Sequence, residues 1–165
     1  MKNVAALLLC AGCLTLCAGC AKSAELSAFH DEVDSFYEGL TQSVSELEAI
    51  DPASESAADD MLSCLDEMSL LFWQFSEAEV PEKMEDRIGN VDELADQAAA
   101  YMQEACRLWH DAWEGEEYDE AAAQAAQEYY TRAMEWVNYI SLLLQGRIPE
   151  GENVTVVAGT EETTG

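Results

Sequence analysis

The sequence predicts an all-α protein, an antiparallel four-helix bundle followed by a disordered C-terminal tail. Four successive stretches carry apolar residues at steps of three and four, the spacing that places side chains on one face of an α-helix. Helix-breaking residues, among them Pro52, Pro81 and Gly146, separate or end these stretches. The length of 165 residues is that of a single domain able to bury its own core.

The first predicted helix covers residues 23–50. Its apolar stripe consists of Leu26, Phe29, Val33, Phe36, Leu40, Val44, Leu47 and Ile50. It should end at Asp51-Pro52, because proline disfavours a helical conformation in the residue before it.

The second predicted helix begins near Ser54 and ends before Val80-Pro81. Its apolar stripe consists of Ala57, Met61, Cys64, Leu65, Met68, Leu71, Phe72 and Phe75. A turn near Pro52 would set Phe29 opposite Phe75 and Val33 opposite Leu71.

The third predicted helix is interrupted at Gly89-Asn90 and ends at Glu114-Gly115-Glu116. Its stripe consists of Met84, Ile88, Val91, Ala95, Ala98, Met102, Ala105, Trp109 and Ala112. Asn90, with Glu93 three residues later, could cap a restart of the helix after the interruption.

The fourth predicted helix ends at Gly146, with Pro149 beyond it, the usual order at a helix C-terminus. Its stripe consists of Tyr118, Ala122, Ala125, Tyr129, Ala133, Trp136, Ile140 and Leu143. If the chain turns near Glu116, residue numbers that sum to about 232 lie opposite each other. Large side chains such as Trp109 then face alanines such as Ala123, which favours dense packing.

The charge of the chain is strongly negative and is unevenly placed. Of the seven basic residues only Lys2 precedes Cys20, and all 34 acidic residues follow it, so the chain from Cys20 onward has a formal net charge of −28. Such a surface repels phosphate backbones, so we expect no nucleic-acid partner. Cationic partners would be attracted, although carboxylates on helix faces often serve only for solvation.

The first twenty residues have the order of an export signal. One positive charge at Lys2 is followed by an apolar run over residues 4–16 and then by small residues up to Cys20. The run is shorter than the roughly 20 apolar residues of a membrane-spanning helix, and no cluster of cations follows it. A permanent transmembrane anchor is therefore the weaker interpretation.

The segment Leu16-Cys17-Ala18-Gly19-Cys20 resembles the cleavage box of bacterial lipoproteins. The resemblance implies that the signal peptide is removed before Cys20, which then receives a diacylglycerol on its sulfur. Cys17 stands where the class usually has leucine, a departure that leaves Cys13, after Ala11-Gly12, as an alternative acceptor. Acyl chains such as palmitate would then hold the protein at a membrane, since two chains anchor stably and one does not.

The resemblance, which covers only about the first twenty residues, predicts the location of the protein. Together with the apolar stripes it divides the chain into four segments. Residues 1–19 form the signal peptide, 20–23 the lipidated cysteine and a short linker, 24–146 the acidic four-helix bundle, and 147–165 the disordered tail. The protein would be extracytoplasmic and lipid-anchored to the bacterial cell membrane, or to the outer membrane if the host has one. Ala21, rather than an aspartate, follows Cys20, which in a host with two membranes resembles the default pattern for sorting to the outer membrane. In the tail, residues 154–157 could form an edge strand or remain unstructured.

Two cysteines, Cys64 and Cys106, lie within the predicted bundle. Each could be a small buried hydrophobic residue. A disulfide between them is possible if the hairpin is centred near residue 85, whereas a centre near residue 80 leaves them too far apart.

The remaining candidate site residues are aromatic. Tryptophan and tyrosine are numerous for a bundle of this size and more often fill a core than line a binding site. Trp109, Trp113 and Tyr130 are the candidates for an aromatic surface that binds a ligand or partner. His30 and His110 are the only histidines, and neither belongs to a metal-binding or nucleophile-activating motif. We therefore expect no catalytic residues, no metal and no cofactor.

The leading functional prediction is a non-enzymatic lipoprotein whose helical domain binds an envelope protein, a cationic peptide or another envelope component. One alternative is a helical bundle that sequesters a small molecule or cations between its helices. Another is an envelope hydrolase whose site the sequence does not reveal.

Overall fold

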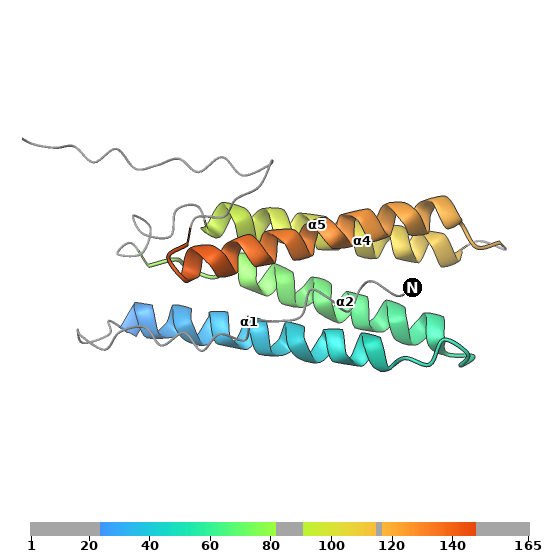
Figure 1. Ribbon diagram of the computed structural model, residues 1–165, viewed down its shortest axis with the longest axis horizontal. Coiled ribbons are helices and arrows are strands. Elements are labelled where there is room, and N and C mark those ends of the chain that lie inside the picture. Colours follow the sequence, from blue (N-terminus) through green and yellow to red (C-terminus); the bar gives the residue numbers. More distant parts are fainter. Residues whose placement is uncertain (1–23, 82–90, 115–116, 148–165) are drawn as a thin grey trace, which may run out of the picture.

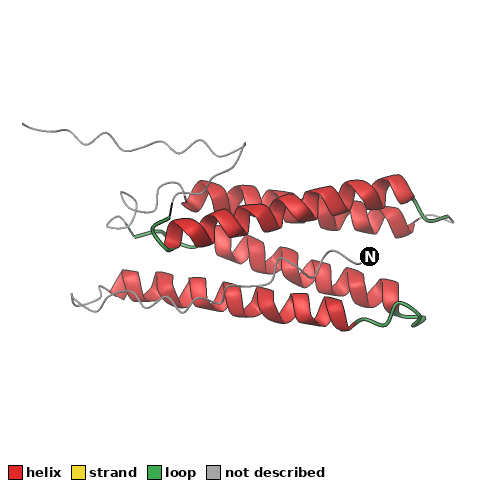
Figure 2. Cartoon of the chain, viewed as in Figure 1, coloured by secondary structure: helices red, strands yellow, loops and turns green. Residues whose placement is uncertain are grey.

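The computed structural model describes residues 24–81, 91–114 and 117–147. Within these ranges the chain forms four helices, α1 (Ala24–Ala49), α2 (Ala57–Ser76), α4 (Val91–Glu114) and α5 (Glu120–Leu144). The helices lie side by side and alternate in direction (Figure 1), and the described residues contain helices and loops alone (Figure 2). The predicted all-α, antiparallel four-helix bundle is confirmed.

The helix boundaries follow local backbone chemistry. The first helix agrees with its prediction to within one residue, whereas α2 begins at Ala57 rather than near Ser54. The difference arises because Asp51 organises a turn, in which its carboxylate accepts a hydrogen bond from Ala53 N at 3.0 Å. The carbonyl of Asp51 also accepts from Ser54 N at 2.9 Å. The predictions for residues 1–23, 82–90, 115–116 and 148–165 lie outside the described residues.

The core runs along the centre of the bundle and receives side chains from all four helices. Its largest fully buried members are Phe29, Phe72, Met68, Met102, Ile140, Val33 and Val91. Burying a side chain of this size contributes roughly 1.5–3 kcal/mol relative to leaving it in water. Burial of the apolar stripes is thus the main force that holds the helices together.

The helices α4 and α5 make the most extensive helix–helix contact in the bundle. Both bury alanines, which are Ala95, Ala98, Ala105 and Ala112 on α4 and Ala123, Ala126 and Ala133 on α5. Small side chains allow two helix backbones to approach closely. The rings of Tyr101 and Tyr129 meet at 5.9 Å, close to the predicted register of this hairpin.

The predicted register of the first hairpin is wrong by nearly two helical turns. Phe36, not Phe29, stacks on Phe75 at 4.4 Å, and it meets Phe72 edge-on at 5.3 Å. Phe29 lies seven residues earlier on α1, about 10 Å along the helix axis. Likewise Leu71 lies against Gly39 rather than Val33. The cause is the connection over residues 50–56, which delays the start of α2.

Both ends of α5 have well-defined caps. At the N-terminus, Asp119 Oδ1 accepts hydrogen bonds from Ala121 N at 2.9 Å and Ala122 N at 3.1 Å. At the C-terminus, Gly146 has a φ of 71°. Gly146 N donates to the carbonyl of Leu143 and Arg147 N to that of Leu142, each at 2.8 Å, which is the Schellman pattern. The predicted stop at Gly146 is confirmed.

Removal of the N-terminal cap should destabilise the protein measurably. We expect Asp119→Ala to lower the free energy of unfolding by about 1 kcal/mol, because two backbone N–H groups lose their acceptor. Urea denaturation followed by circular dichroism measures this change. Asp119→Asn is the matched control, since asparagine keeps a capping oxygen; an equal loss in both variants would show that the charge and not the cap is responsible.

Candidate functional site

The three aromatic residues predicted to form one binding surface are not brought together. Trp109 and Tyr130 are half-buried and pack against the core, whereas Trp113 is 44% exposed. Tyr130 lies ten residues into α5, about 15 Å from its start at Glu120. Two of these side chains therefore contribute to packing, and only Trp113 presents much of its surface to solvent.

Trp113 has a partner that the sequence did not single out. The ring of Tyr118 lies 4.7 Å from that of Trp113 at an interplanar angle of 56°, and Tyr118 is 49% exposed. The sequence placed Tyr118 on the apolar stripe of the fourth helix. Because Asp119 caps α5, Tyr118 precedes the helix instead and can turn toward Trp113.

An open hollow lies beside this aromatic pair, at the N-terminus of α5. Its lining residues are Glu117, Tyr118, Asp119, Glu120, Ala121 and Gln124. We refer to Trp113, Glu117, Tyr118, Asp119 and Glu120 together as the end surface. It combines two exposed aromatic faces with three carboxylates at one end of the bundle.

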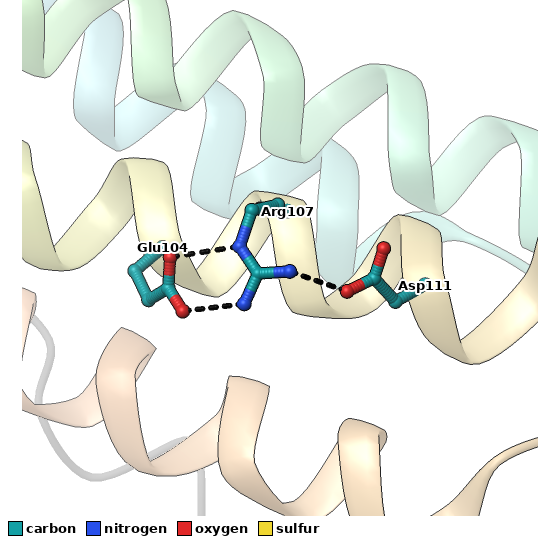
Figure 3. A network of polar contacts seen from close by, with 3 residues as sticks. All are labelled: Glu104, Arg107 and Asp111. Atoms are coloured by element: carbon teal, nitrogen blue, oxygen red, sulfur yellow. Dashed lines mark hydrogen bonds and ion pairs between the residues drawn. The ribbon is translucent and has the colours of Figure 1, made fainter.

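Arg107 and Arg132 are engaged with other groups rather than with the end surface. Arg107 is held between Glu104 and Asp111 on α4, with hydrogen bonds of 2.9 and 2.6 Å to the two oxygens of Glu104 (Figure 3). Arg132 lies over the ring of Tyr101, at 5.9 Å from its centroid. Within the described ranges, Glu117 and Glu120 form no ion pair.

The network around Arg107 is electrostatic and exposed to solvent. The hydrogen bonds between the two side chains hold the pKa of Glu104 below its usual value and raise that of Arg107 above its own. Exposed pairs of this kind contribute little to stability, because water and salt screen them.

The disulfide considered for Cys64 and Cys106 is not formed in the structure, which has both as free, buried thiols. Cys64 Sγ donates to the carbonyl of Ser43 on α1 at 3.1 Å, and Cys106 Sγ donates to that of Leu65 on α2 at 3.1 Å. The two sulfurs thus face different neighbouring helices. Burial raises the pKa of Cys106 to about 11 and also raises that of Cys64, so both are protonated at neutral pH. The other expectation, that Cys64 and Cys106 are each a small buried hydrophobic residue, agrees with the structure.

The two histidines lie on different helices. His110 Nε2 on α4 lies 3.0 and 3.1 Å from the carboxylate oxygens of Asp66 on α2, in a pair on the bundle surface. His30 is on α1, and its Nε2 is buried without a hydrogen-bond partner among the described residues. In the part of the chain that the structure describes, no three His, Cys, Asp or Glu side chains are placed to hold a metal ion.

Comparisons with known proteins give no relative from which a role could be transferred. No protein-family model matches the chain, and no match was found among curated proteins or solved structures. None of the helices described here has the length and apolar character needed to cross a membrane.

Proposed function

We propose that the protein is a lipoprotein, held at a membrane by acyl chains on Cys20, whose acidic bundle is a non-enzymatic binding module outside the cytoplasm. The observation that carries this proposal is the leader, in which a charged start, an apolar run and small residues lead up to Cys20. The partner would be an envelope protein or a cationic peptide, since the mature chain is strongly anionic.

The position of α1 supports this arrangement, because a lipid on Cys20 would orient the bundle. The helix begins at Ala24, only four residues after Cys20. Four residues span at most about 14 Å, so the start of α1 would lie close to the lipid headgroups. The 26 residues of α1 extend about 39 Å from that point. The end surface lies at the opposite end of the bundle (Figure 1), where it would face away from the membrane.

Metabolic labelling with radioactive palmitate tests the anchor. We expect wild-type protein expressed in a bacterium to incorporate the label and Cys20→Ala to incorporate none. Cys13→Ala is the matched control, because it removes the alternative acceptor and should leave labelling unchanged. Equal labelling of wild type and Cys20→Ala would refute the assignment of the lipid to Cys20.

A further inference from the structure

The end surface is the part of the described bundle where exposed aromatic rings and unpaired carboxylates meet beside a hollow. Trp113 and Tyr118 expose nearly half of their surface, although they contact each other. Glu117 and Glu120 line the hollow without an ion pair to any described residue. Exposed apolar side chains that lie together, rather than singly, are typical of surfaces that contact a partner.

The chemistry of these side chains selects the kind of partner. The face of an aromatic ring attracts a cation, and tryptophan is the strongest of the aromatic residues in this respect. A guanidinium group stacks on aromatic rings and also fits carboxylates with two parallel hydrogen bonds. Arginine can use both kinds of group at the end surface at once, and a compact lysine ammonium cannot do so equally well.

We infer that the end surface docks an arginine-bearing peptide segment, with a guanidinium group against Trp113 and Tyr118 and its N–H groups donating to Glu117 or Glu120. This inference rests on the proposed binding function and names its site and its partner. Charge decides between occupants, because a second copy of this chain carries the same negative charge and would be repelled. A phosphate-bearing ligand is disfavoured by the same carboxylates.

Calorimetric titration of the purified full chain with a short peptide of alternating glycine and arginine, at physiological ionic strength, tests the inference. We expect wild-type protein to bind, and Trp113→Ala and Tyr118→Ala each to raise Kd about tenfold. Trp73→Ala is the matched control, since Trp73 is a similarly exposed tryptophan, at 56%, on the outer face of α2. Its Kd should stay within about twofold of the wild-type value, a change too small to indicate a lost contact.

A second pair of variants keeps the test independent of any effect on folding. Glu117→Gln and Glu120→Gln retain the size of exposed side chains and should each weaken binding and reduce its dependence on salt. The inference is overturned if the wild type does not bind the peptide, if Trp113→Ala and Tyr118→Ala bind as the wild type does, or if Trp73→Ala weakens binding equally. The titration uses protein in solution, so its result is independent of palmitate labelling, which tests the anchor.

Discussion

Replacing Phe36 by alanine should lower the free energy of unfolding by about 3–5 kcal/mol, the usual cost of removing a buried phenylalanine. Phe36 is 4% exposed, stacks on Phe75 and meets the edge of Phe72, so it joins α1 to the C-terminal end of α2. Truncation would leave a cavity that two aromatic rings on the facing helix cannot fill. Since small domains have only about 5–15 kcal/mol of stability, the loss is a large part of the total.

Urea denaturation followed by circular dichroism measures this change. Trp73→Ala provides the control, because it also deletes an aromatic side chain, but one that is 56% exposed. We expect its free energy of unfolding to stay within about 0.5 kcal/mol of the wild-type value, as is usual for surface substitutions. Equal losses in the two variants would contradict the observed packing of α1 on α2.

The bundle should lose stability steeply as the pH rises from 9 to 12. Burial raises the pKa of Tyr37 to about 12, and a hydrogen bond with Ser141 offsets only part of this effect. Burial likewise raises the pKa of Tyr130 to about 12 and that of Cys106 to about 11. In the unfolded chain these groups ionise near 10 for tyrosine and 9 for cysteine.

The direction of the effect follows from proton binding. Between the unfolded and the folded pKa the native state retains protons that the unfolded state has lost, so stability falls as the pH rises. The stabilisation is therefore complete below pH 9, falls from pH 9 to 11 for Cys106 and is lost from pH 10 to 12 for the tyrosines. Ionisation of each tyrosine lowers the free energy of unfolding by roughly 2–3 kcal/mol at most, because each unit of pKa shift corresponds to about 1.36 kcal/mol.

Chemical denaturation repeated across this pH range measures the loss. We expect Tyr37→Phe to flatten the decline between pH 10 and 12, although it also removes the hydrogen bond from Tyr37 Oη to the carbonyl of Val137 at 3.3 Å. Tyr118→Phe removes an exposed hydroxyl instead and should leave the pH dependence unchanged. If wild type and Tyr37→Phe show the same decline, burial of Tyr37 does not contribute to it.

Much of this fold could be predicted from the sequence, because helical periodicity is a local property. The spacing of Val33, Leu40 and Met68 on apolar stripes indicates which faces are buried, and all three are buried. The register of α4 against α5 was also predictable, since the connection between these helices is short. The register of α1 against α2 was not, because it depends on a turn organised by Asp51 and its hydrogen bonds.

The candidate site was harder to predict, since exposure is decided by tertiary packing. Trp109, Trp113 and Tyr130 are all of residue types that are common in binding surfaces. The structure separates them, because the tryptophans lie near the C-terminus of α4 whereas Tyr130 lies near the middle of α5. Tyr118 was not predicted as a site residue, because its position fits the helical period of the apolar stripe. The cap at Asp119 instead places Tyr118 before the helix. For the cysteines, spacing along the chain could not tell which neighbouring helix each sulfur would face.

The mass of the protein recovered from the membrane fraction of expressing cells is the sharpest test of a lipid anchor on Cys20. We expect a chain that begins at Cys20 and carries the added mass of a diacylglycerol on that residue. A chain that keeps residues 1–19, is found in the cytosol and bears no fatty acid would contradict it.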